Sequence, residues 1–334
     1  MLLEATNMRV RYRAGGDAVR AVDGVDLALA ADQVYGIVGE SGCGKSTLVK
    51  ALLRLLPRSA TIDVDRLVFN GRDLMKTDDR TFRREVLWRE LALVPQSAQN
   101  SLNPVYRVGD QIVEAIRAHA PTPRARALER VAALFDVVGL QPDLLRRYPH
   151  EFSGGMRQRA MIAMALAFEP ALVVMDEPTT GLDVLVQERL LRRIREIRQR
   201  VKSSILLITH DIAVIAEMAD RIGVMYAGRM VEDAPAGELF ERPFHPYTLG
   251  LRNAFPNIRE PDRALISIPG APPDLAASVR GCGFAARCPF VREVCRAERP
   301  DVLPVGDTHL SACLRHADIA VLRAAAAEKS TWRS

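Results

Sequence analysis

Gly39-Glu40-Ser41-Gly42-Cys43-Gly44-Lys45-Ser46-Thr47 follows directly after the apolar run Val34-Tyr35-Gly36-Ile37-Val38. The pattern G-x-x-x-x-G-K-S between a strand and a helix is typical of a phosphate-binding loop. Its glycines leave room for backbone N–H groups to surround phosphate oxygens. Lys45 is expected to reach the β- and γ-phosphates and Ser46 to bind Mg²⁺, at the positive end of the helix that follows. The stretch therefore predicts a nucleoside triphosphate site formed by Gly39, Ser41, Gly42, Cys43, Gly44, Lys45, Ser46 and Thr47.

Length and composition limit the class of protein. A chain of 334 residues, 48% of them hydrophobic, can form one large α/β domain with a smaller appendage. The longest unbroken apolar run, residues 160–168, is too short for a membrane-spanning helix, which needs about 20 residues. The N-terminus lacks the features of a signal peptide. The net charge of +5 comes from scattered Lys and Arg residues without a basic and aromatic stripe. We expect a cytoplasmic protein without a nucleic-acid partner.

Hydrophobic periodicity predicts an α/β core interrupted by a helical segment. Residues 97–168 show few strand signals and then helical patterns, and after about residue 240 prolines become frequent. This predicts a nucleotide-binding domain 1–242, with its core in 1–96 and 169–242 and a helical subdomain in 97–168, followed by a loop-rich extension 243–334. The expected strands are 6–13, 22–29, 34–38, 91–94, 171–175, 204–208 and 221–226. The expected helices are 46–56 (ended by Pro57), 108–119, 125–138, 154–168, 184–200 and 211–218.

Two carboxylates end an apolar strand at Val173-Val174-Met175-Asp176-Glu177. In a phosphate-loop fold, the first carboxylate of such a pair, Asp176, holds Mg²⁺, usually through water. Glu177 is then placed to polarise the attacking water as general base. The alternative is an acidic turn after a strand, which the complete phosphate loop upstream disfavours.

Ser153-Gly154-Gly155 stands at the start of a predicted helix. A hydroxyl, bare amides and a helix dipole together make an anion site. Taken alone, an ordinary capped helix would be the better interpretation. If the helix lies on a separate helical subdomain, its use would be to complete the nucleotide site of a second molecule.

Three further residues are candidates by position. Gln96 lies between a core strand and the helical segment, where it can reach both Mg²⁺ and that segment. His210 follows a core strand and is expected at the γ-phosphate, although a lone histidine is usually structural. Tyr12 is expected to stack on the adenine ring, and a strand aromatic packed in the core is nearly as good an interpretation.

The ordered set of motifs resembles the nucleotide-binding subunit of ATP-binding-cassette (ABC) transporters. It comprises the phosphate loop, Gln96, Ser153-Gly154-Gly155, Asp176-Glu177, Asp183 and His210. The family signature usually begins Leu-Ser-Gly-Gly-Gln; Phe152 and Met156 replace its first and last residues here, a variation that we expect to keep function. The resemblance implies a RecA-like ATPase core and a head-to-tail dimer. In that dimer ATP lies between one chain's phosphate loop and the other chain's Ser153, and Asp183 belongs to the loop by which the two sites communicate.

Four more segments resemble the oligopeptide and dipeptide importer branch of this family. They are residues 95–104, 148–151, 245–248 and 268–275, and the cysteine segment follows them. The resemblance implies two ATPase chains, identical or paralogous, beneath two membrane permeases that an extracytoplasmic substrate-binding protein supplies. It places the chain at the cytoplasmic face of the membrane, with residues 97–106 against a permease. Dipeptides or oligopeptides would be the cargo, and nickel complexes are the alternative.

Four of the five cysteines follow the spacing Cys282-x5-Cys288-x6-Cys295-x17-Cys313. A reducing cytoplasm disfavours disulfides, and zinc sites more often show C-x-x-C pairs, which are absent here. Four thiolates in a proline-rich segment with little core suit an iron–sulfur cluster. Some members of the importer branch are thought to carry a four-iron, four-sulfur cluster in this segment. Four buried free thiols are the alternative. Cys43 is expected to be a filler residue of the phosphate loop without a redox role.

Two other functions are alternatives to a transport ATPase. A soluble ABC ATPase outside transport could serve iron–sulfur assembly, DNA repair or the ribosome. However, the chain has no coiled-coil insertion between Gln96 and Ser153, it has one phosphate loop, and assembly ATPases normally lack an extension such as 243–316. A non-catalytic module is disfavoured because Lys45, Asp176, Glu177 and His210 are all intact.

Overall fold

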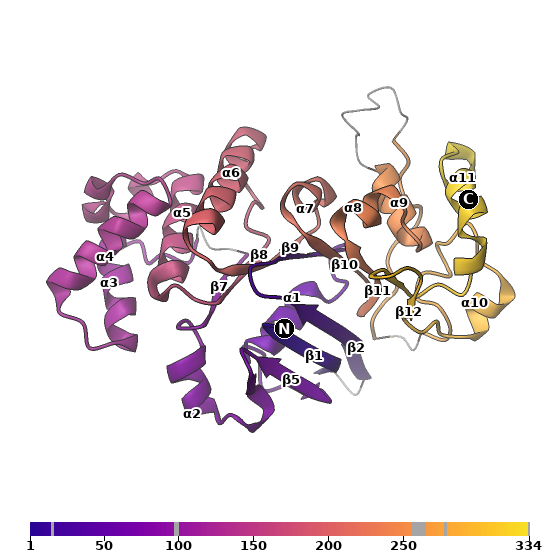
Figure 1. Cartoon of the computed structure of the whole chain (residues 1–334), viewed down its shortest axis with the longest axis horizontal. Helices are drawn as coiled ribbons and strands as arrows, with labels where there is room; N and C mark the ends of the chain where they lie inside the picture. The colour runs from indigo at the N-terminus through magenta and orange to yellow at the C-terminus, as the bar shows by residue number, and fades with distance from the viewer. Residues whose placement is uncertain (15–16, 97–99, 255–264, 277–278, 333–334) are drawn as a thin grey trace. The chain divides into compact units, whose positions relative to one another are not determined.

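The computed structural model (Figure 1) describes residues 1–334 except 15–16, 97–99, 255–264, 277–278 and 333–334. The chain divides into two compact units, and each has its own strands and helices. The first unit comprises Met1–Leu2, Leu29–Val34 and Val68–Ile208, and the second comprises Leu3–Ala28, Tyr35–Leu67 and Thr209–Ser334. In the described part of the chain, no helix is both long enough and apolar enough to cross a bilayer.

Parallel strands form the centre of the first unit. They are β7 (Leu91–Val94), β8 (Leu172–Asp176) and β9 (Ser204–Thr209). β8 pairs with both others, so that Leu172 lies opposite Leu91 on one side and Ser204 on the other. All residues of β8 and β9 are buried, as expected for continuous apolar runs in a sheet covered on both faces. The parallel arrangement brings the carboxyl ends of these strands to one edge, where Asp176 ends β8.

Helices α3 (Val108–His119), α4 (Arg124–Val137) and α5 (Gly154–Ala165) of the first unit pack side by side (Figure 1). In α3, residues Val108, Ile112, Val113 and Ile116 are buried at helical spacing, so one face of the helix is apolar. The helices predicted in residues 97–168 are confirmed. The helices of this unit are α2 (Asp79–Thr81), α3 (Val108–His119), α4 (Arg124–Val137), α5 (Gly154–Ala165) and α6 (Val184–Arg200). Its shorter elements are β6 (Arg72–Asp73), η1 (Leu74–Lys76), the π-helical turn η2 (Phe82–Val86), η4 (Pro142–Arg146), η5 (Pro149–Glu151) and η6 (Leu166–Phe168).

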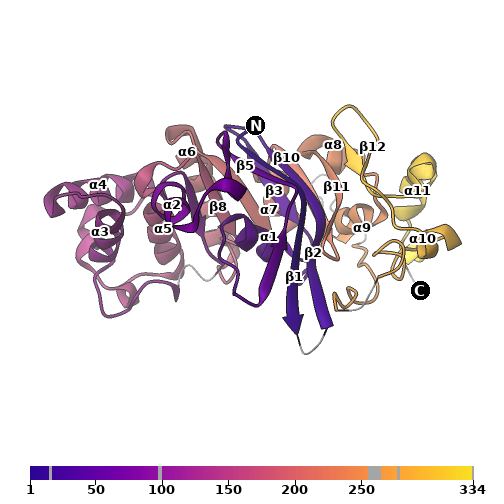
Figure 2. The ribbon, with the colours of Figure 1, turned by 90° about the horizontal axis from the view of Figure 1, so that it is seen from below.

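The second unit contains two groups of strands. In one, the long strands β1 (Leu3–Ala14) and β2 (Asp17–Leu29) run side by side (Figure 2), and β4 (Ala60–Asp63) pairs antiparallel with β1. The other group is mixed: β3 (Val34–Val38) is parallel to β10 (Arg221–Tyr226). Strands β11 (Arg229–Pro235), β13 (Leu310–Ser311) and β12 (Leu303–Pro304) follow in antiparallel order. Apart from this group, β5 (Arg66–Phe69) pairs antiparallel with β6.

The C-terminal extension is more regular than the prolines predict. It adds β13 and β12 to the edge of β11, and its helices α9 and α11 contact each other. Strand β11 (Arg229–Pro235) was not predicted, because Glu232 and Asp233 interrupt its apolar pattern. The helices of the second unit are α1 (Lys45–Leu52), α7 (Ile212–Met218), α8 (Ala236–Glu241), α9 (Pro246–Ala254), α10 (Glu293–Ala297) and α11 (Ile319–Ala326), with 3₁₀ turns η7 (His316–Asp318) and η8 (Lys329–Trp332).

The predicted end of the helix after the phosphate loop is wrong. The helix was expected to continue to residue 56 and stop at Pro57, but α1 ends at Leu52. Arg54 adopts a left-handed backbone with φ of 52°, and the N–H of Leu55 donates to the carbonyl of Lys50 at 2.8 Å. The left-handed residue Arg54 therefore ends the helix, and the later Pro57 does not indicate this earlier end.

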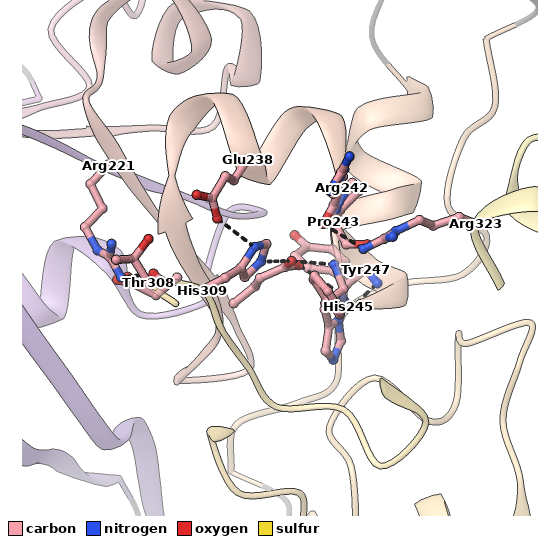
Figure 3. A network of polar contacts seen from close by, with 12 residues as sticks. Arg221, Glu238, Arg242, Pro243, His245, Tyr247, Thr308, His309 and Arg323 are labelled. Carbon is pink, nitrogen blue, oxygen red and sulfur yellow. Dashed lines mark hydrogen bonds and ion pairs between the residues drawn. The ribbon is translucent and has the colours of Figure 1, made fainter. Parts of the chain in front are cut away.

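A buried carboxylate holds the extension to the sheet. Glu232 of β11 is fully buried and accepts hydrogen bonds from the backbone N–H groups of Phe244, at 2.5 Å, and His245, at 3.0 Å. The ring of His309, labelled in Figure 3, adds a third contact of 2.7 Å from Nε2 to Glu232 Oε1. Strand β11, the segment of Phe244 and His245, and the more distant His309 thus meet at one carboxylate. A buried ionisable group requires such partners, because isolated burial of a charge is costly.

The neighbouring residue Asp233 has its own buried partners. The hydroxyl of Tyr35 donates to its carboxylate, and Arg221 forms an ion pair with it. Arg221 also donates to the carbonyl of Thr308 at 2.9 Å (Figure 3). Burial raises the pKa of Asp233 despite Arg221. Both acidic residues of β11 are therefore structural, which explains how a charged strand enters the interior.

We expect buried His245 to make the protein sensitive to acid. Its Nδ1 accepts a hydrogen bond from the N–H of Tyr247 at 3.1 Å, and burial lowers the pKa of His245 from 6.5 to about 3. Between these values the unfolded chain binds a proton that the folded chain does not. Stability contributed by this residue is therefore complete above pH 6.5 and is lost towards pH 3. The expected slope is about 1.4 kcal/mol per pH unit.

Denaturant unfolding of the wild type and of His245→Asn at several pH values between neutral and acid measures this slope. The variant should lose less free energy of unfolding on acidification, because asparagine does not titrate. Equal slopes in the two proteins would contradict the assignment, since the Glu232–His309 pair is the same in both.

Candidate functional site

The loop after β3 needs its glycines for two different reasons. Gly42 and Gly44 have φ of 80° and 107°, a backbone region that L-residues with side chains disfavour. A Cβ on Gly44 would lie 2.1 Å from the carbonyl oxygen of Ala21, and one on Gly39 would lie 2.2 Å from that of Met225. The loop therefore runs against neighbouring backbone and keeps its fold only with glycine at these positions.

Lys45 lies inside this loop. Its side chain is buried, and Nζ donates to the carbonyl oxygens of Gly39, at 2.7 Å, and Glu40, at 3.0 Å. The N-cap of α1 is Gly44, which offers no side-chain cap to the first turn. Backbone N–H groups at such a helix start can bind an anion. The loop thus combines a positioned ammonium group, bare amides and the hydroxyl of half-buried Ser46.

Two other predicted site residues of the second unit, Tyr12 and His210, are at least partly exposed to solvent. Tyr12 lies in β1 opposite Ala60 and is half-buried. His210 is exposed directly after β9, and the next residue, Asp211, caps α7 through its carboxylate. The roles expected of Tyr12 and His210 stay predictions. Burial raises the pKa of the Cys43 thiol, which holds it in the neutral form.

In the first unit, the structure brings Gln96 and Glu177 together. Gln96 Nε2 donates to Glu177 Oε2 at 2.8 Å, and Thr180 Oγ1 donates to the same oxygen at 2.9 Å. Asp176, directly before Glu177, is buried at the end of β8. Thr180 was not predicted from the sequence, although it lies only three residues after Glu177 and makes a local contact with it.

The backbone of Glu177 is unusual for its residue type. Its φ is 49°, and its N–H donates to the carbonyl of Ile208 on β9 at 2.8 Å. A left-handed glutamate is energetically unfavourable unless its surroundings fix it, and such residues cluster at functional sites. Here the neighbouring strand and two side-chain donors hold the carboxylate in one orientation.

Ser153 and Asp183 lie at the N-terminal ends of two helices that touch. Ser153 Oγ accepts from the N–H of Met156 at 3.3 Å and caps α5, as predicted from the sequence. Asp183 Oδ1 accepts from the N–H of Val186 at 2.9 Å and caps α6. A Cβ on Gly155 would lie 2.6 Å from Val186 Cγ1, so glycine permits the close contact between the helices.

The surface beside these helix ends is apolar. Val184 and Leu185, in the first turn of α6, are 80% and 65% exposed. Large apolar side chains exposed next to each other often mark a surface that a partner covers. Ser153, Asp183 and this pair therefore belong to one exposed end of the first unit.

The four C-terminal cysteines line one small cavity in the second unit, together with aromatic and aliphatic side chains. The N–H of Cys282 donates to the carbonyl of Cys295 at 2.8 Å, and Cys313 Sγ accepts from the N–H of Arg315 at 3.4 Å. No disulfide joins them. Burial raises the pKa of Cys288 and of Cys313 to about 12. Among the described residues, no group of three or more His, Cys, Asp or Glu side chains is arranged to hold a metal ion.

Comparison with family models finds two matches along the chain. The model described as "ABC transporter" matches residues 22–180, which contain the phosphate loop, the Ser153 motif and the carboxylate pair. The model described as "Oligopeptide/dipeptide transporter, C-terminal region" matches residues 231–295, which contain Glu232, His245 and three of the four clustered cysteines.

Curated relatives align over nearly the whole chain. A probable peptide ABC transporter ATP-binding protein of Sinorhizobium fredii is 42% identical, over 96% of each chain. The dipeptide transport ATP-binding protein DppD of Bacillus subtilis is 40% identical, over 93% of this chain and 94% of its own. The oligopeptide transport ATP-binding protein OppD of Salmonella typhimurium is 39% identical, over 94% of each chain.

Solved structures share the fold at lower identity. The ATP-binding cassette MJ0796, solved as a dimer bound to ADP and phosphate, has a TM-score of 0.60 at 23% identity, over 70% of this chain and 98% of its own. The protein cbiO1 of Clostridium perfringens, described as part of the ABC transporter complex cbiONQ, has a TM-score of 0.61 at 24% identity, over 75% and 95%. The predicted α/β phosphate-loop fold is thus confirmed.

Proposed function

The chain belongs to the family of ABC transporter ATP-binding proteins, and we propose that it drives a membrane importer of dipeptides or oligopeptides. As a member of this family the chain is an ATPase that uses ATP with Mg²⁺. The main support for a peptide cargo is a family match. Residues 231–295 match the C-terminal region of oligopeptide and dipeptide transporters. Relatives named for peptide transport that align over 93% to 96% of the chain support it and disfavour an ATPase outside transport.

The partners that we propose are two transmembrane permeases, a second ABC ATPase chain, identical or paralogous, and an extracytoplasmic substrate-binding protein. The chain would lie on the cytoplasmic face of the membrane. Val105 and Tyr106, which are 70% and 58% exposed, support a docking role for the segment expected to touch a permease. Residues 97–99 of that segment lie outside the described residues.

We propose that hydrolysis follows from positioning and charge, because phosphoryl transfer requires little covalent chemistry from the protein. Lys45 and the loop amides would bind the β- and γ-phosphates. Ser46, Asp176 and Gln96 would hold Mg²⁺, which supplies charge neutralisation. Glu177, oriented by Gln96 and Thr180, would accept a proton from the attacking water.

A second chain would complete the site. We propose that Ser153, Gly154, Gly155 and Asp183 of one chain meet the nucleotide held by the other, with His210 at the γ-phosphate. The shared exposed end that carries Ser153 and Asp183, with Val184 and Leu185 beside it, supports this arrangement. The division into a domain 1–242 and an extension 243–334 also stays a proposal.

We further propose that Cys282, Cys288, Cys295 and Cys313 bind an iron–sulfur cluster. Their common cavity supports this, because four thiols from one short region face the same space. The described side chains are not arranged to hold a metal ion of any kind, so binding would require the thiols to converge. A polynuclear cluster demands less convergence than a single ion, since each thiolate binds a different iron. Metal binding would also have to deprotonate thiols that burial keeps neutral.

Anaerobic purification followed by iron and acid-labile sulfide analysis tests the cluster. We expect iron and sulfide in equal amounts and brown absorbance, both lost in a variant with all four cysteines replaced by serine. A colourless wild-type protein without iron or sulfide would end this proposal.

Uptake in cells tests the cargo. Deleting the gene should abolish uptake of radiolabelled dipeptides or oligopeptides, and the wild type, but not Glu177→Gln, should restore it. If peptide uptake survives the deletion while uptake of radioactive nickel is lost, the peptide assignment is wrong.

A further inference from the structure

Arg287 joins the cysteine segment to the phosphate loop. It directly precedes Cys288, and its side chain is only 6% exposed. Its partner is Glu40, the second residue of the loop, in the same unit of the structure. The two residues are 247 positions apart in the sequence.

The pair is bidentate. Arg287 Nη1 donates to Glu40 Oε2 at 2.6 Å, and Nη2 donates to Oε1 at 3.0 Å. Nη1 also reaches the hydroxyl of Tyr226 at 3.2 Å, and Nε donates to the carbonyl of Pro269 at 2.8 Å. Two parallel charge-assisted bonds fix orientation as well as distance. The guanidinium is thus fixed by the sheet, the extension and the loop together.

Glu40 is held by its backbone as well. Its N–H donates to the hydroxyl of Tyr247 at 3.0 Å, and its carbonyl accepts from Lys45 Nζ at 3.0 Å. Tyr247 lies on α9 of the extension and is fully buried. Two residues of the extension, Tyr247 and Arg287, therefore hold the loop residue that contacts the lysine of the phosphate site.

Aromatic packing makes this connection stiff. The rings of Tyr226 and Tyr247 have centroids 4.6 Å apart, and Phe284 lies 5.3 Å from the first and 5.4 Å from the second. Phe284 belongs to the cysteine segment and also lines the cavity of the four thiols. Displacement of that segment would therefore be transmitted to Tyr247 and Arg287, because packed interiors transmit strain.

The charge of Glu40 explains why such a connection matters. A carboxylate in a loop that binds a triphosphate repels the ligand unless a cation neutralises it. Arg287 supplies that cation from within the fold, and it leaves the ammonium of Lys45 directed at the loop carbonyls.

We propose that Arg287 is a positioning residue for ATP, which orients and neutralises Glu40 and thereby couples the four-cysteine segment to the phosphate loop. The proposal does not depend on what the cysteine cavity binds. A change in that segment that moves Arg287 would alter nucleotide affinity, and by linkage nucleotide binding would alter the segment.

A double-mutant cycle on the full chain tests this, with the fluorescent nucleotide MANT-ATP and Mg²⁺ as the probe. Arg287→Gln leaves the Glu40 charge unneutralised, and its dissociation constant should rise about tenfold. Glu40→Gln should bind better than Arg287→Gln, because it removes the repelling charge and its amide oxygen can still accept a hydrogen bond from Arg287. The double variant should bind better than Arg287→Gln alone, and Arg287→Lys should fall between Arg287→Gln and the wild type.

Arg299→Gln is the matched control. Arg299 also links the extension to the core, but its ion pair, at 2.5 Å, is with Asp23 of β2 and not with Glu40 of the loop. It should therefore keep wild-type affinity, and thermal unfolding of every variant separates folding defects from binding defects. The proposal is overturned if the double variant binds as weakly as Arg287→Gln, or if Arg299→Gln weakens binding as much. If Arg287→Gln does not fold, the same comparison can be made with Arg287→Lys. The nucleotide affinity of this variant is then compared with that of the double variant that also carries Glu40→Gln.

Discussion

Replacing Glu177 with glutamine is expected to slow ATP hydrolysis by about 10²-fold or more, while Mg²⁺–ATP stays bound. Glutamine has the same shape, and its carbonyl oxygen can accept the hydrogen bonds that Gln96 and Thr180 donate to Glu177 Oε2. The substitution therefore keeps the geometry and removes the proton acceptor. Phosphate release in a steady-state assay, with the permeases present if the isolated chain is inactive, measures the effect.

The control for this variant is Glu188→Gln on α6. Glu188 is exposed, with 56% of its side chain accessible, and it pairs with Arg192 on the same helix. It should leave turnover unchanged. Light scattering adds a second measurement: with Mg²⁺–ATP, the Glu177→Gln chain should form a stable dimer with itself or with its paralogue. Near-normal turnover in Glu177→Gln would refute the assignment of the general base.

Glu177 also shows what the sequence could and could not predict. The apolar strand followed by two carboxylates predicted its place at the end of β8, because the carboxyl ends of parallel strands meet at one edge. Its left-handed backbone and the contact with Gln96, 81 residues away, were not predictable. Local patterns identify such residues, but only the packed fold brings them together.

The structure of the C-terminal extension was harder to predict from the sequence than the place of Glu177. Cysteine spacing suggested a common site, yet only the structure places the four thiols around one cavity. Prolines suggested loops, whereas β13 joins the edge of β11. No sequence pattern singled out Glu232, which is buried because the backbone N–H groups of Phe244 and His245 and the ring of His309 satisfy it. Long-range hydrogen-bond partners leave no periodic signal in a sequence.

The largest expected effect on nucleotide binding is that of Lys45→Ala, which should weaken binding of Mg²⁺–MANT-ATP by about 10²-fold or more. Nζ is buried and is held over the loop by the carbonyl oxygens of Gly39 and Glu40. In the wild type the loop already fixes the position of this cation, so binding does not cost the entropy of ordering it. The substitution removes this pre-positioned charge. It also removes the donor that holds the carbonyl of Glu40, while Arg287 and Tyr247 would still hold this residue through its carboxylate and its N–H group.

Lys50→Ala on the exposed side of α1 is the matched control, because it removes the same charge from the same helix without changing the loop. If general electrostatic attraction draws the nucleotide, both variants should lose similar affinity and added salt should reduce both losses. If the loop positions the charge, Lys45→Ala alone should lose binding, at low and at high salt. Lys45→Met, which keeps most of the side-chain volume, should behave like Lys45→Ala if the ammonium group itself is needed. If both Lys45 variants bind the nucleotide with nearly wild-type affinity, the proposal that the phosphate loop binds the nucleotide is wrong.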